Sequence, residues 1–168
     1  MGAWIHNAVW SDALYLDYRN YVKANAPKLR WQTEDCADLS ISLLIDFAAD
    51  KHVEVTFVDN DQNYYMSRAR GAPELDPYFT WKTKEEFYEV VKRKIGTAAL
   101  WKQNTVKNND GPMPGDLMMR YEDFWGGYHH TALIYEVYQP GVCHRTKRPY
   151  DGERPRMVGL DQPAMGRR

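Results

Sequence analysis

Apolar side chains recur at helical spacing near the start of the chain. Ser11 can cap a helix and Pro27 is expected to end it, so we predict a helix over residues 12–26. The apolar residues that share one face of this helix are Leu14, Tyr18, Tyr21 and Val22.

A second helix, predicted from Asp35 to Asp50, is apolar almost all round. Because such a helix must be covered on most sides, we expect it to be the central helix of the domain, with Cys36 in its first turn. Its polar side chains form one narrow stripe of Asp35, Asp38, Ser42 and Asp46.

The middle of the chain mixes a short strand, an irregular stretch and a further helix. Residues 52–58 alternate enough for a strand, whereas residues 59–82 lose the pattern and predict an ordered but irregular excursion. Thr83 and Glu86 form a capping box in front of a helix that ends at Gly96. A short helical piece is expected near residues 98–102.

The last part of the chain predicts strands. Two of them, at residues 116–121 and 129–138, are separated by the loop 122–128 and are expected to pair antiparallel. Another is expected at residues 156–160. Helices come first and the sheet follows, which favours an α+β fold in which a helix packs on a small antiparallel sheet.

Composition narrows the class of protein. With 168 residues, of which 43% are hydrophobic, the chain fits one globular domain over residues 1–168. The net charge of −1 argues against a nucleic-acid groove, and no apolar run approaches the roughly 18 residues of a membrane span. The first ten residues lack the basic and apolar regions of a signal peptide.

The two cysteines are expected to be free thiols, and Cys36 is the one placed for chemistry. At a helix start the dipole favours the thiolate, and free backbone N–H groups can hold an oxyanion. Acyl transfer by cysteine uses both. Cys36 could instead be a small buried hydrophobe, as free cysteines often are. We assign no role to Cys143.

A histidine pair, His129 and His130, stands at the start of an apolar strand. Strand alternation lets one of the two face a given partner. His130 shares its face with Ala132 and Ile134, whose side chains would fit against the central helix. Either histidine could be structural, and we expect no metal site because adjacent strand positions point apart.

A third polar group should orient the histidine ring through its other nitrogen. Asp161 is the best placed carboxylate, since it closes the strand expected after the histidines. The competitors for the role are Asp151, Glu153, Gln139 and Gln162. Asp161 and each of these competitors could also be a plain loop residue.

Three motifs now stand in order: Asp-Cys-Ala-Asp at residues 35–38, Pro-Gly-Asp-Leu-Met at 114–118, and His-Thr-Ala-Leu-Ile-Tyr at 130–135. This order resembles the NlpC-type papain-like cysteine peptidases and amidases. Those proteins carry an Asp-Cys-Ser-Gly-like turn at a helix start, then a Gly-Asp-Leu strand, then a His-Val-Gly-Ile-Tyr-like strand. The resemblance implies a papain-like fold with a buried catalytic helix, Cys36 as nucleophile, His130 as base and no cofactor.

Within that group the chain is similar to peptidoglycan amidase effectors, because Ala37-Asp38 replaces Ser-Gly and the N-terminal helix is rich in aromatics. The resemblance implies action on peptidoglycan peptide stems in a target-cell periplasm, export by a type VI-like secretion system, and a dedicated inhibitor protein in the producing cell.

Four residues are candidates for contacting the substrate or the oxyanion. Asp35 directly precedes the cysteine, and Gln32 lies four residues upstream of it, closer than the papain-type oxyanion glutamine usually sits. Trp125 and Gly126 precede the histidines in a loop that could form one wall of a cleft or be a plain hairpin loop.

Two alternatives belong to other functional classes. A papain-like fold could carry out acyl transfer or deamidation on a protein or lipid. It could also persist as a binding module that has lost its chemistry.

Overall fold

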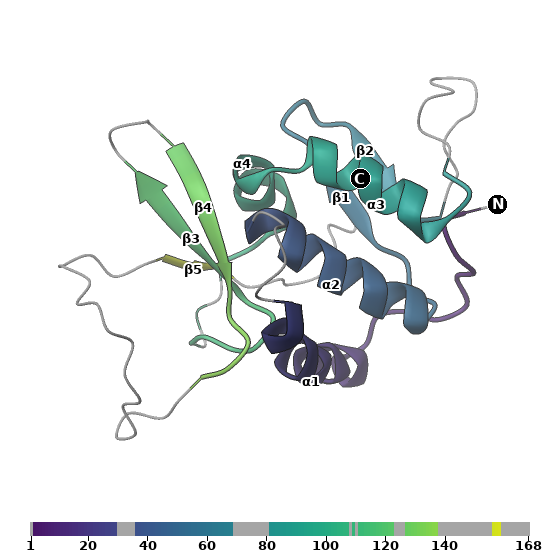
Figure 1. Cartoon of the computed structure of the whole chain (residues 1–168), viewed down its shortest axis with the longest axis horizontal. Helices are drawn as coiled ribbons and strands as arrows, with labels where there is room; N and C mark the ends of the chain where they lie inside the picture. Colours follow the sequence, from purple (N-terminus) through teal and green to yellow (C-terminus); the bar gives the residue numbers. More distant parts are fainter. Residues whose placement is uncertain are drawn as a thin grey trace.

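The computed structural model describes residues 2–29, 36–68, 81–107, 109, 111–122, 127–137 and 156–158. They form an α+β arrangement around a central helix, with a three-stranded antiparallel sheet beside one end of that helix and a two-stranded antiparallel sheet along its side (Figure 1). The elements are α1 (Asp12–Leu29), α2 (Cys36–Asp50), β1 (Thr56–Val58), β2 (Tyr64–Met66), α3 (Lys84–Lys94), α4 (Thr97–Ala99), the π-helix η2 (Leu100–Asn104), β3 (Leu117–Glu122), β4 (Gly127–Leu133) and β5 (Arg156–Val158).

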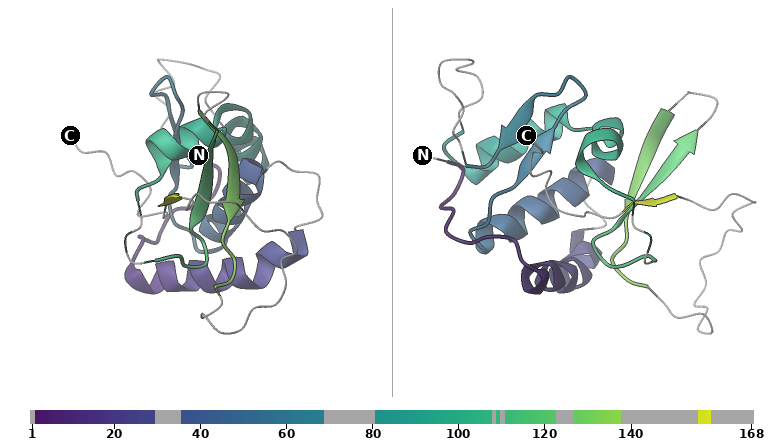
Figure 2. Two further views of the ribbon diagram at one scale, coloured as in Figure 1. Left: turned by 90° about the vertical axis from the view of Figure 1, so that its left-hand side faces the viewer. Right: turned by 180° about the vertical axis from the view of Figure 1, so that it is seen from behind.

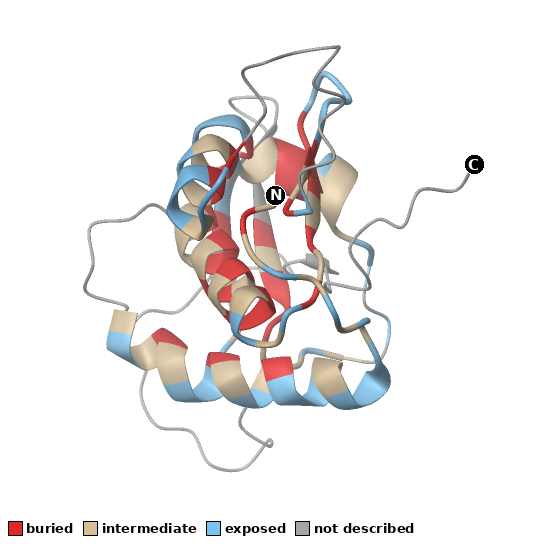
Figure 3. Ribbon diagram, turned by 90° about the vertical axis from the view of Figure 1, so that its right-hand side faces the viewer, coloured by how far each residue is buried: buried red, intermediate tan, exposed pale blue. Residues whose placement is uncertain are grey.

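The prediction of a central helix is confirmed by α2. It packs against α1, α3 and β4, and Figure 2 shows these elements around it from two further sides. Buried positions occur along its whole length, as Figure 3 shows by colour. The side chains of α2 that are at most 2% exposed are Ala37, Ile41, Leu43, Ile45, Phe47 and Ala48.

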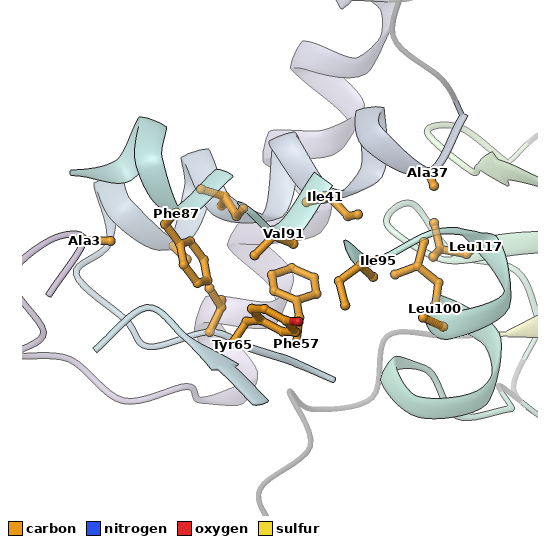
Figure 4. Close-up of a cluster of buried hydrophobic side chains, with 14 of the residues drawn as sticks. Ala3, Ala37, Ile41, Phe57, Tyr65, Phe87, Val91, Ile95, Leu100 and Leu117 are labelled. Atoms are coloured by element: carbon orange, nitrogen blue, oxygen red, sulfur yellow. The ribbon is translucent and has the colours of Figure 1, made fainter. Parts of the chain in front are cut away.

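Two clusters of buried side chains divide the core on either side of α2. The first lies between α2, α3 and the β1–β2 hairpin and reaches β3 (Figure 4). The second joins α1 to α2 through Tyr18, Val22 and Phe47, whose rings and methyl groups interlock. Four partly buried residues pack against both clusters: Trp10, Leu14, Leu44 and Leu133.

Helix α1 does not end at Pro27, contrary to the prediction. The helix continues to Leu29, with the proline inside its last turn. A proline that close to the end removes one intrahelical hydrogen bond and disturbs little beyond it. Ala26 is 3% exposed and Leu29 packs against the second cluster, so tertiary contacts hold the final turn in helical form.

The capping signal before α3 is confirmed. Thr83 Oγ1 accepts a hydrogen bond from the Glu86 backbone N–H at 3.2 Å. The Glu86 carboxylate accepts from the backbone N–H of Lys82 at 2.6 Å, one residue earlier than in a standard capping box. The helical piece expected near residues 98–102 is present as α4 and η2.

The hairpin partner of β1 was not predicted, because β2 falls in the stretch expected to be irregular. Its register with β1 is antiparallel, from Thr56–Met66 to Val58–Tyr64. The side chain of Asp59 organises the turn: its carboxylate accepts from the backbone N–H groups of Asp61 and Asn63, from the Asn63 amide and from the Tyr65 hydroxyl. Side-chain hydrogen bonds of this kind leave no periodic signal.

The C-terminal sheet has the order β4-β3-β5, and both pairings are antiparallel. The predicted pairing of the two strands before and after residues 123–126 is therefore confirmed, as is a strand beginning at Arg156. Strand β4 begins at Gly127 and ends at Leu133, earlier at both ends than expected. Among the described residues, no helix is long and apolar enough to cross a membrane.

Candidate functional site

Helix α2 is described from Cys36, which places this residue in the first turn of the helix, as the sequence predicted. Its N-terminal end lies beside the C-terminal sheet (Figure 1). Ala37, the next residue, is 2% exposed and belongs to the same buried cluster as Leu117 of β3 (Figure 4). The side chain of Cys36 lies outside the described part of the structure, as do Gln32 and Asp35.

The strand that carries His130 packs on this central helix. Two of its residues face inward: Thr131 is fully buried, and Leu133 packs against both core clusters. The Thr131 hydroxyl lies 3.1 Å from Thr97 Oγ1 of α4 and 3.1 Å from Met119 Sδ of β3. These contacts fix β4 one residue from His130.

The expectation that His130, Ala132 and Ile134 face the central helix is wrong. His130 is exposed, and the inward face is the one that carries Thr131 and Leu133. The reason is tertiary: a threonine hydroxyl can be buried in an apolar layer when a neighbour accepts or donates, and Thr97 supplies that neighbour. The exposed imidazole of His130 is open to solvent.

The pairing of β3 with β4 shifts beside the histidines. Arg120 pairs with His130, whereas the next residue, Tyr121, pairs with Tyr128, so His129 is the extra residue of a β-bulge. A bulge breaks the strict alternation of side chains, so alternation cannot separate the two histidines at this point. The side chain of His129 is outside the described residues.

The turn that enters β3 is locked to the end of β4. Gly115 has a φ of +95°, and its backbone N–H donates to Ile134 O at 2.8 Å, while Ile134 N–H donates to Asp116 O at 2.8 Å. Asp116 is 5% exposed, and its carboxylate accepts from Met113 N–H at 2.8 Å. Asp116 therefore caps the turn.

Tyr18 of α1 packs against this turn. A Cβ on Gly115 would lie 3.1 Å from Tyr18 Cε1, so a side chain there would press on the ring. Burial raises the pKa of the Tyr18 hydroxyl, and the nearby Tyr21 and Asp116 raise it further, so this hydroxyl stays protonated at neutral pH. Tyr18 thus joins α1 to the turn at one end of the sheet.

The strand expected to lead to the third catalytic residue lies on the far side of β3 from β4. Arg156 pairs with Met119, and Val158 pairs with Leu117, so β5 runs away from the row of His130. Asp161 itself remains a prediction, because it lies outside the described residues. So do its competitors Gln139, Asp151, Glu153 and Gln162, and the loop residues Trp125 and Gly126.

The part of the chain that the structure describes holds no group of three or more His, Cys, Asp or Glu side chains that could bind a metal ion. Thr97 and Thr131 are the supporting residues that sequence reasoning missed. A polar residue between His130 and an apolar run was the available signal for Thr131, whereas nothing in the sequence links it to Thr97.

Comparisons with protein-family models, with curated proteins and with solved structures found no match to this chain.

Proposed function

We propose that this chain is a cysteine amidase or peptidase with a papain-like fold that hydrolyses a peptide bond of bacterial peptidoglycan. The observation that carries the proposal is the meeting of two elements. A buried helix with Cys36 in its first turn points its N-terminal end toward a small antiparallel sheet, and the strand bearing His130 packs on that helix. His130 itself is exposed on that strand, so its pairing with Cys36 rests on the resemblance and not on the packing of the strand.

In the proposed reaction, the Cys36 thiolate attacks the carbonyl carbon of the scissile amide. Backbone N–H groups at the start of α2 hold the oxyanion, because the first turn of a helix has no internal acceptors for them. Protonated His130 then donates its proton to the leaving amine, and a thioester remains on Cys36.

The second half of the reaction releases the enzyme. Neutral His130 takes a proton from water, the hydroxide attacks the thioester, and the acid product leaves as the Cys36 thiolate is restored. The exposed position of His130 supports this step, because water can reach the ring. Asp161 remains our candidate for orienting the imidazole.

The proposed cell-wall substrate rests on the resemblance to amidase effectors. Three further proposals about the biology of the protein rest on the same resemblance. These are delivery by a type VI-like secretion system, action in the periplasm of a target cell, and restraint by an inhibitor protein in the producer.

Mass spectrometry of purified peptidoglycan, digested by the wild type and by three variants, tests the proposal. We expect the wild type to release peptide fragments and Cys36→Ala to release none. His130→Ala should be reduced by at least about 100-fold, since general acid–base groups typically contribute that much. His129→Ala is the matched neighbour: because strand alternation does not separate the two histidines at the bulge, this variant tests which of them is the base, and the proposal requires it to keep most of the activity if it folds.

Alkylation by a small thiol reagent distinguishes the alternatives. An activated Cys36 should react much faster than Cys143. The pH dependence of its alkylation rate should have its midpoint below the free-thiol pKa of about 8.5. Fast alkylation without peptidoglycan cleavage would redirect the proposal to acyl transfer or deamidation on another substrate. Equal, slow alkylation of both thiols would identify an inactive binding module and overturn the catalytic proposal.

A further inference from the structure

Residues 2–10 lie along the hairpin end of the molecule, away from the C-terminal sheet (Figure 1). The Ala3 N–H donates to Ser67 O at 2.9 Å, and the N–H groups of Asn7 and Ala8 both donate to His52 O at 3.1 Å. Ala8 also forms a parallel bridge with Val53. The segment is therefore attached by few backbone hydrogen bonds and one isolated bridge.

Side chains on alternate positions hold the same segment. The indole N–H of Trp4 donates to Val53 O at 2.9 Å, and that of Trp10 donates to Glu54 O at 2.8 Å. The intervening Ile5 and Val9 are 71% and 78% exposed, so the outer face contributes little burial. The side chains on the inner face, Trp4, His6 and Trp10, therefore hold the segment in place.

His6 lies between the two indoles and makes a titratable contact. Its Nε2 is 2.8 Å from Ser67 Oγ, and that same oxygen accepts the Val55 backbone N–H at 3.0 Å. Because Ser67 is fully buried and its oxygen already accepts one bond, its own hydroxyl proton is best donated to Nε2. That arrangement requires neutral His6 with its proton on Nδ1.

The charged groups around His6 oppose its protonation. Burial lowers the pKa of His6, and the positive charges of Arg68 and His52 lower it further. Glu54 is occupied in an ion pair with Arg68 at 3.8 Å. The ring centroids of Trp4 and His6 are 5.3 Å apart, and an aromatic ring at this distance favours a cation. The pKa of His6 is nevertheless lowered, so the neutral form of the imidazole is favoured.

We propose that the contact between His6 and Ser67 is an acid-sensitive latch that releases residues 2–10 from the hairpin when His6 takes up a proton. Protonation places an N–H on Nε2 opposite the Ser67 hydroxyl, so the buried hydroxyl loses its acceptor. Desolvated, and facing two cationic neighbours, the imidazolium gains by moving into water, and the segment moves with it.

The sign of the pH effect follows from the direction of the shift. A histidine whose folded pKa is below its unfolded value binds fewer protons when folded, so attachment is complete above the unfolded pKa and is lost as the pH falls through the folded pKa. The latch does not depend on the proposed chemistry of Cys36, and its test needs no substrate.

Amide hydrogen exchange, resolved by NMR and corrected for intrinsic rates, tests the latch between about pH 8 and about pH 4. We expect the protection of the Ala3, Asn7 and Ala8 amides to fall at least about tenfold on acidification, following the titration of the His6 ring. Amides in α2 should keep their protection over the same range.

Two variants separate His6 from its neighbours. His6→Gln keeps an acceptor for the Ser67 hydroxyl but cannot titrate, so the fall in protection should disappear. His52→Asn keeps a residue that tolerates the left-handed backbone, and it removes one positive neighbour, so the fall should persist with its midpoint moved to higher pH.

Three results would overturn the latch. Protection of the three amides could stay constant while the His6 ring titrates, the fall could persist in His6→Gln, or the α2 amides could lose protection together with the N-terminal segment. The first and third are read from the wild type alone, so the test stands even if His6→Gln fails to fold.

Discussion

The hydroxyl of Tyr18 is buried, and it has no hydrogen-bond partner among the described residues. A buried hydroxyl without a partner loses its hydration and recovers nothing. Tyr65 is the opposite case: it is also buried, but its hydroxyl donates to the Asp59 carboxylate at 2.8 Å. Tyr18 and Tyr65 therefore allow the contribution of a buried hydroxyl to the free energy of unfolding to be compared without and with a hydrogen-bond partner.

We predict that Tyr18→Phe raises the free energy of unfolding by about 1 kcal/mol, because it removes only the unsatisfied group. Tyr65→Phe, the matched control, should lower it by about 2 kcal/mol, since a hydrogen bond to a charged acceptor is lost. Urea denaturation at neutral pH measures both. A loss of stability in Tyr18→Phe would mean that its hydroxyl has a partner after all.

Among the elements, the turn before β3 is the one where backbone conformation and packing act together. Gly111 and Gly115 both have positive φ, at +92° and +95°. A Cβ at Gly111 would meet nothing within 4 Å, whereas one at Gly115 would press on the Tyr18 ring. Comparing Gly111 with Gly115 therefore separates the energetic cost of a side chain at positive φ from the cost of its contact with the Tyr18 ring.

Gly111→Ala should lower the free energy of unfolding by about 1 kcal/mol, the usual cost of a side chain in the left-handed region. Gly115→Ala should cost about 1–3 kcal/mol more, because the ring of Tyr18 has to move within a packed cluster. Thermal and urea unfolding of both variants checks the difference. Equal losses would show that the Tyr18 ring yields freely and that the turn is not braced by α1.

Helix α2 ends in a turn whose left-handed residue is a histidine. His52 has a φ of +57°, its N–H donates to Ala49 O at 3.3 Å, and Val53 N–H donates to Ala48 O at 3.0 Å. This is a Schellman motif with histidine where glycine is usual. The same residue presents its carbonyl to Asn7 and Ala8, so the helix end also anchors the N-terminal segment.

For the whole molecule, the four residues that pack against both core clusters predict a single cooperative unfolding unit. Leu43 lies in the second cluster and is fully buried, so Leu43→Ala should lower the free energy of unfolding by about 3 kcal/mol. Leu16, which is 57% exposed on α1, is the control, and Leu16→Ala should change stability by less than about 0.5 kcal/mol.

Tryptophan fluorescence and far-UV circular dichroism should report the same midpoint for the wild type and for Leu43→Ala. Separate midpoints in Leu43→Ala would show that α1 and its cluster unfold independently of α3 and the hairpin. That result would also contradict the prediction of one domain over residues 1–168.

Sequence pattern alone determined the elements whose signal is local. The central helix α2 and the Thr83 cap each depend on residues within a few positions of one another, and each is present where it was expected. The α+β class followed from their order. The papain-like fold and the catalytic roles of Cys36, His130 and Asp161 remain predictions from resemblance.

Only the tertiary structure decided the features that depend on distant partners. Helix α1 continues through Pro27 because its last turn packs against α2, and β2 exists because one buried carboxylate gathers four donors. The inward face of β4 is set by Thr97, more than thirty residues away, and by a bulge at His129. Burial and hydrogen bonding across the fold outweigh local preferences of about 1 kcal/mol, which is why these features could not be predicted from spacing.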